Sequence, residues 1–120
     1  MPGLQGKITD LGGQGNIKKA YVNLAPGADQ VVVAAATGKA YQVTAVEISA
    51  DIAGKIQLHF GAVAGIATKA IAGGWFAVDG GRTLGFGFSG PEGAAGEAIN
   101  ATVTTVTNAI IIVHYLERAS

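Results

Sequence analysis

The chain has 120 residues, a length that suits one domain. It has no cysteine, which excludes disulfides and thiolate metal sites, and only 13% of its residues are charged, against a usual share of about 25%. The formal net charge is zero and no basic stripe is present, so we expect no nucleic-acid or membrane partner and little repulsion between copies of the chain.

The first 16 residues are rich in glycine and show no apolar periodicity. They lack the apolar core of a secretory signal, so we expect a soluble protein that is made in a cytoplasm. The run Gly12-Gly13-Gln14-Gly15-Asn16 is typical of a flexible linker. The sequence therefore predicts a flexible N-terminal arm over residues 1–16 and one folded domain over residues 17–120.

From residue 17 onward, short β-branched and aromatic runs alternate with turn signals. The expected strands cover residues 20–24, 30–36, 41–50, 55–60, 75–78, 83–88, 97–104 and 109–117. The glycine-broken stretch 61–74 is expected to be a loop. No stretch of the chain shows sustained helical spacing with caps. About eight strands at these spacings predict an all-β sandwich or barrel, and a jelly roll is the preferred arrangement.

The run from residue 55 to residue 60 alternates polar and apolar residues without a break, which is typical of a half-buried strand. This alternation predicts that one set of side chains faces the core, namely Ile56, Leu58 and Phe60. It places the other set on the outward side, namely Lys55, Gln57 and His59.

The last expected strand is apolar on both faces. One side carries Ile110, Ile112 and Leu116, and the other carries Ile111, Val113 and Tyr115. A strand that is buried on two faces in so small a sandwich needs a second cover, and a neighbouring subunit is the simplest one. The expected interface residues are Trp75, Phe76, Ile111, Ile112, Val113 and Tyr115.

Two of these candidates, Trp75 and Phe76, follow the flexible pair Gly73-Gly74. Aromatic residues in such a place can anchor a protein interface or stack on a sugar. The simpler alternative is that one ring fills the core while the other faces out, as strand alternation requires.

Sequence motifs for chemistry are weak. Residues 85–90 match the spacing G-x-G-x-x-G, but Pro91 follows in place of a helix, so we expect no dinucleotide cofactor. His59 and His114 are the only histidines and no G-x-S-x-G elbow is present, so we expect no catalytic residues. No cluster of metal ligands is apparent, and the remaining alternative is a calcium site that uses loop carboxylates: Asp79, Glu92 or Glu97.

Residues 41–117 resemble small jelly-roll proteins encoded in the structural-gene clusters of tailed bacteriophages. The resemblance is carried by Gly54-Lys55-Ile56-Gln57-Leu58-His59-Phe60-Gly61, the small-residue stretch 66–74, Gly96-Glu97-Ala98-Ile99-Asn100-Ala101-Thr102, and the final Val113-His114-Tyr115-Leu116-Glu117. These are packing motifs, and the resemblance transfers no catalytic residues.

The resemblance implies a non-enzymatic protein of the virion. The expected function is capsid decoration, in which a homotrimer stabilises the head by binding across subunits of the major capsid protein. The alternative is a receptor- or carbohydrate-binding trimeric knob on a head or tail fibre. An enzyme would instead combine His59 or His114 with an acid and a nucleophile.

Overall fold

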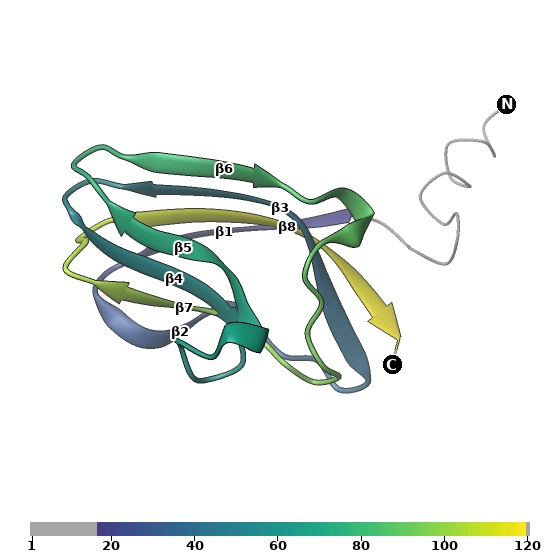
Figure 1. Cartoon of the computed structure of the whole chain (residues 1–120). Coiled ribbons are helices and arrows are strands. Elements are labelled where there is room, and N and C mark those ends of the chain that lie inside the picture. Colours follow the sequence, from purple (N-terminus) through teal and green to yellow (C-terminus); the bar gives the residue numbers. More distant parts are fainter. Residues whose placement is uncertain (1–16, 120) are drawn as a thin grey trace, which may run out of the picture.

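Eight antiparallel strands form two four-stranded sheets that pack face to face (Figure 1). The structure is a computed structural model that describes residues 17–119, so the expected arm over residues 1–16 lies outside the described residues. The strands are β1 (Ile17–Leu24), β2 (Gly27–Val33), β3 (Lys39–Ala50), β4 (Gly54–Phe60), β5 (Ala70–Phe76), β6 (Gly81–Gly85), β7 (Ile99–Thr104) and β8 (Ala109–Ala119).

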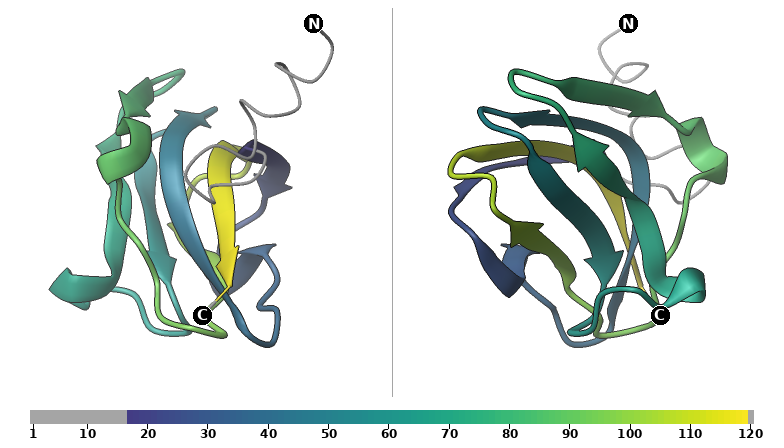
Figure 2. Two further views of the ribbon diagram at one scale, coloured as in Figure 1. Left: turned by 90° about the vertical axis from the view of Figure 1, so that its right-hand side faces the viewer. Right: turned by 60° about the vertical axis from the view of Figure 1, so that its left-hand side comes forward.

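One sheet has the strand order β1-β8-β3-β6 and the other has the order β2-β7-β4-β5. The chain can be followed as one long hairpin that bends between β4 and β5. Its two arms pair antiparallel as β1·β8, β2·β7, β3·β6 and β4·β5. Rolling that hairpin up adds the ladders β3·β8 and β4·β7. This is the connectivity of a jelly roll, and the expected all-β sandwich of eight strands is confirmed. In the left view of Figure 2, the teal strand β5 and the yellow strand β8 lie in separate layers.

The core lies between the two sheets. The alternation predicted for β4 is confirmed on its apolar side, because Ile56, Leu58 and Phe60 are all buried. From the other sheet, Ile111 and Val113 of β8 face them as members of the same apolar cluster. The core is therefore built from alternate residues of both sheets, as sandwich packing requires.

The expected loop over residues 61–74 was wrong in its second half, because β5 begins at Ala70. Its centre is Gly73, with φ at +139°, and a Cβ at that position would lie 2.2 Å from the carbonyl oxygen of Ile56 on β4. Only glycine permits this close approach of two strands. Since glycine has a low strand propensity, the local sequence predicted a loop where the first part of β5 lies.

Strand β3 contains a bulge at Thr44, where its register with β8 shifts. Beyond the bulge, β6 pairs with the second half of β3. Beside the first half lies the segment 91–96, whose backbone bonds include Val43 N to Pro91 O at 2.9 Å and Gly93 N to Tyr41 O at 2.9 Å. The edge of this sheet is thus shared by β6 and by the irregular segment 91–96. The strand expected over residues 83–88 ends at Gly85, where the pairing of β6 with β3 stops before the bulge, and a short 3₁₀ turn follows it.

Candidate functional site

The sheet β1-β8-β3-β6 has one face that the second sheet does not cover, and we call it the outer face. Residues that lie directly opposite on neighbouring strands point to the same side. Tyr21 of β1 is opposite Ile112 of β8, which is in turn opposite Glu47 of β3. Because Ile111 and Ile48 next to them face the core, this row of three side chains points outward. The neighbouring rows are Lys19–His114–Ala45 and Asn23–Ile110–Ser49.

Apolar side chains are concentrated on the outer face where β1 meets β8. Tyr21 is 60% exposed and Ile17 is 53% exposed. Ile112 lies opposite Tyr21 on β8, Ile110 lies in the next row, and both are half-buried, whereas Ile17 lies two rows away beyond Lys19 and His114. A single exposed apolar residue is ordinary, whereas a contiguous group rimmed by polar residues is typical of a binding surface.

A shallow depression of about 330 Å³ lies on the same face, where β8, β3 and β6 adjoin. Ser49 and Gly81 face each other across β3 and β6, and their small size leaves the hollow. The remaining lining residues are Glu47, Ile48, Arg82, Thr83, Ile110 and Ile112. The outer face therefore carries an exposed aromatic ring on its β1 side and a hollow on its β3–β6 side.

The structure divides the six interface residues predicted from the sequence. Trp75 and Ile112 have side chains on the surface, the first 74% exposed on β5 and the second half-buried on the outer face. The other four are members of the core and leave little or no side-chain surface to a partner: Phe76, Ile111, Val113 and Tyr115. The sequence showed that both sides of β8 are apolar, but it did not show which side the second sheet covers.

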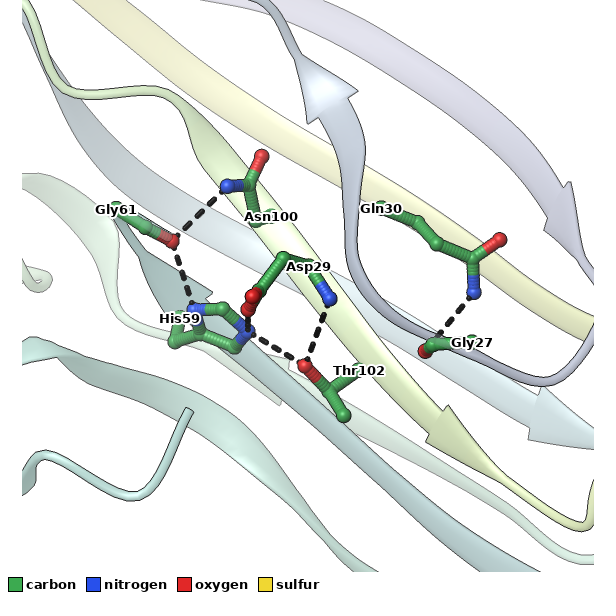
Figure 3. Close-up of polar contacts among 7 residues, drawn as sticks. All are labelled: Gly27, Asp29, Gln30, His59, Gly61, Asn100 and Thr102. Carbon is green, nitrogen blue, oxygen red and sulfur yellow. Dashed lines mark hydrogen bonds and ion pairs between the residues drawn. The ribbon is translucent and has the colours of Figure 1, made fainter. Parts of the chain in front are cut away.

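His59 was expected to face outward from its strand, but it is not exposed there, since the residue is 1% exposed. Its Nδ1 lies 3.0 Å from the carbonyl oxygen of Gly61, and its Nε2 lies 3.0 Å from Oγ1 of Thr102 (Figure 3). The carboxylate of Asp29 lies 3.8 Å from the same Nε2, and the backbone N–H of Asp29 donates to Thr102 Oγ1. Asn100 donates a second hydrogen bond to Gly61 O, at 2.9 Å.

We call this buried polar network the His59 clamp, and its arrangement is structural. A carbonyl oxygen can only accept, so His59 Nδ1 donates to the carbonyl oxygen of Gly61, and His59 Nε2 shares a second hydrogen bond with the hydroxyl of Thr102. A catalytic relay needs its acid and its nucleophile on opposite ring nitrogens. Here Thr102 and Asp29 both face Nε2, and the ring is closed off from solvent. The polar network joins β2, β4 and β7 within one sheet.

The loop carboxylates considered for calcium do not converge. Glu97 accepts hydrogen bonds from Lys69 Nζ at 2.6 Å and from the backbone N–H of Ala94 at 2.7 Å. Burial raises the pKa of Glu97, but these two donors together hold that pKa below its ordinary value. Within residues 17–119, no group of three or more histidine, aspartate or glutamate side chains is placed to hold a metal ion.

No family model, curated protein or solved structure matches this chain. Over the same described residues, the structure contains no helix that is both long and apolar enough to cross a membrane.

Trp75 marks a second surface, on the opposite sheet. It pairs with Lys55 of β4, whose ammonium lies 5.5 Å from the centroid of the indole ring, a cation–π contact. Next to this pair is a groove of about 460 Å³, whose lining includes Gln57, Gly73 and Arg82. An exposed indole beside donors and acceptors can stack on a sugar ring, so this surface keeps the glycan-binding alternative open.

Proposed function

We propose that this chain is a structural protein of a bacteriophage particle, a capsid decoration protein that acts as a homotrimer without catalysing a reaction. The observation that carries the proposal is the outer face, where Tyr21, Ile110 and Ile112 form an apolar surface that the second sheet does not cover. The low content of charge and the zero net charge favour association. The sequence resemblance to jelly-roll virion proteins supports a partner of a particular kind, the major capsid protein of a phage head.

Decoration would act through linkage. A protein that binds only the assembled shell stabilises the shell in proportion to its binding free energy. A stable contact of this kind buries about 1,600 Å² in total. Many copies on one particle, each held at more than one point, multiply the effect by avidity. The chain would be made in the host cytoplasm and would reside in the virion.

Residues 1–16 are proposed to contact neighbouring capsid subunits. They precede β1 in the sequence, and β1 is an edge strand of the sheet that carries the outer face. A polar, glycine-rich segment can wrap a partner surface when it binds. Deleting residues 1–16 should leave thermal unfolding of the sandwich unchanged and weaken binding to particles. Equal binding by the truncated chain would reject this part of the proposal.

The direct test uses particles that lack this protein. Purified chain is added in increasing amounts, and both the bound copies per particle and the temperature of particle disruption are measured. Decoration predicts that binding saturates at a fixed copy number and that the disruption temperature rises with occupancy. Failure of the folded chain to co-sediment with the particles would overturn the proposal.

A glycan-binding knob is the second candidate, and the exposure of Trp75 favours it. Since Trp75 is the only tryptophan, its fluorescence reports directly on this surface. Titration with polysaccharides from the host surface should shift the emission if a sugar stacks on the indole. Trp75→Ala should then abolish polysaccharide binding and leave particle binding unchanged. An unchanged emission spectrum at saturating polysaccharide would exclude this candidate.

A further inference from the structure

The two halves of the outer face differ in shape and in charge. The β1 half presents the exposed ring of Tyr21 and the exposed cation Lys19. The β3–β6 half presents the depression beside Ser49 and Gly81 together with the exposed anion Glu47. A surface of this kind complements another copy of itself when unlike halves meet.

We infer that neighbouring copies of this chain join through the outer face, with Tyr21 of one copy seated in the depression of the next and Lys19 of the first paired with Glu47 of the second. This inference rests on the proposed homo-oligomer and specifies its contact.

The charges are arranged for a contact between copies. Strand β8 lies between β1 and β3, so it separates Lys19 from Glu47 within one chain. Neither makes an ion pair with another residue in the range 17–119. By contrast, Lys18 next to Lys19 is already paired with Glu117 at 2.9 Å.

Arg82 is the other charged residue in the lining of the depression, and its sign is the same as that of Lys19. Its Nη1 donates to the carbonyl oxygen of Gly73 on the opposite sheet, at 3.0 Å. The guanidinium is thereby directed away from the outer face. Glu47 is the one anion in the lining of the depression.

The register allows the contact to close into a ring. Tyr21 and Glu47 lie in one row across the sheet, at the level of Ile112. Rotation about an axis parallel to β8 keeps this level and brings the β1 half of one copy against the β3–β6 half of the next. Lys19 is two residues along β1 from Tyr21, about 7 Å, which a lysine side chain can span. Contacts between unlike halves form closed rings when the rotation closes, as in a trimer.

In this contact, apolar burial provides the affinity and charge provides the orientation. Tyr21 and Ile112 supply the area removed from water, while the charged pair fixes which halves meet, since like charges across an interface oppose association. Reversing one charge should therefore weaken the oligomer, and reversing both should restore it.

The experiment measures the dissociation constant of the oligomer by analytical ultracentrifugation at low ionic strength. Lys19→Glu and Glu47→Lys are each expected to raise this constant about tenfold or more. The double variant, with the charges exchanged, is expected to return to within about threefold of the wild type. Lys55→Glu makes the same change in net charge as Lys19→Glu, but on the opposite sheet, and serves as its control, with no effect on the dissociation constant expected. Thermal melts confirm that each variant is folded.

Tyr21→Ala tests the aromatic contact separately. Because the side chain is largely exposed in one chain, its removal should spare the fold and raise the dissociation constant about tenfold. If the dissociation constant is unchanged by either single charge reversal and by Tyr21→Ala, the inferred contact is wrong, although the protein still forms an oligomer. A wild-type chain that stays monomeric at all concentrations would overturn both this inference and the proposed homo-oligomer. Binding to particles is a separate measurement, so attachment to the capsid can fail while this contact between copies stands.

Discussion

Tyr21 of β1 and Ile112 of β8 lie directly opposite each other, and both side chains point away from the core. Ile111, which directly precedes Ile112 on β8, points inward and is fully buried. Neighbouring isoleucines of β8 therefore belong to different surfaces: one stabilises the monomer, and the other is available to a partner.

The first prediction compares Ile111→Asp with Ile112→Asp. An unpaired carboxylate at the buried position costs several kcal/mol, a large share of a stability of about 5–15 kcal/mol. At the half-buried position the cost should be near 1 kcal/mol, while self-association is lost. Circular dichroism melts and light scattering measure the two effects. An Ile111→Asp variant that melts at or above the melting temperature of Ile112→Asp would show that the sides of β8 are assigned incorrectly.

The second prediction concerns the buried clamp around His59. His59→Ala removes the donor to Gly61 and the hydrogen-bond partner of Thr102, so it should lower the free energy of unfolding by about 1–3 kcal/mol. His59→Asn retains a donor near the position of Nδ1 and should lose less. Urea denaturation of the three proteins gives the comparison. A loss under about 0.5 kcal/mol for His59→Ala would mean that the clamp contributes little.

The third prediction uses two glycines of the stretch that matches G-x-G-x-x-G. A Cβ at Gly90 would lie 1.8 Å from the carbonyl oxygen of Val43, whereas a Cβ at Gly85 would meet no atom within 4 Å. Gly90→Ala should therefore destabilise the fold by about 1–3 kcal/mol, and Gly85→Ala should have little effect. Thermal unfolding distinguishes them. Equal tolerance at both positions would contradict the close packing of the segment that follows the 3₁₀ turn.

The fourth prediction is a pH dependence at Asp51. Hydrogen bonds from the Thr107 hydroxyl and from the side chain and backbone of Asn108 hold the pKa of Asp51 well below its ordinary value. A carboxyl whose pKa is lowered by folding stabilises the fold above its unfolded pKa of about 3.9, and that contribution is lost as the pH falls below this value.

Asp51→Asn should thus melt at a lower temperature than the wild type at neutral pH, and the difference should shrink below about pH 4. Asp79→Asn, at a turn carboxylate on another loop, is the control. A melting difference that stays constant from neutral to acidic pH would show that the carboxylate charge of Asp51 is not what joins the two loops.

Much of the fold follows from local pattern. The alternation of residues 55–60 predicted the core side of β4, and the turn signals separated the eight strands. The first five residues of β5, 70–74, were expected to be a loop because they end in Gly73-Gly74, and at Gly73 glycine is required by the approach of β4 rather than by any local preference. Tertiary packing decided that element, and tertiary packing is not visible in a window of sequence.

The candidate site was predicted only in part. Ile112 was expected at an interface, but its neighbours Tyr21 and Glu47 come from strands that are distant in sequence, and only the register of β1·β8 and β3·β8 places them in one row. His59 fitted the outward phase of its strand, yet Asp29 and Thr102 enclose it. Alternation gives the side of a sheet on which a residue lies, and it does not give what covers that side.

Electron microscopy of the assembled particle tests the central proposal most directly. If the chain decorates the capsid, a map of the particle should contain density that fits the sandwich of residues 17–119, at positions that bridge neighbouring capsid subunits, with outer faces turned toward one another around a symmetry axis. A complete particle, isolated while the protein is being made, whose surface carries no density of this shape would contradict it.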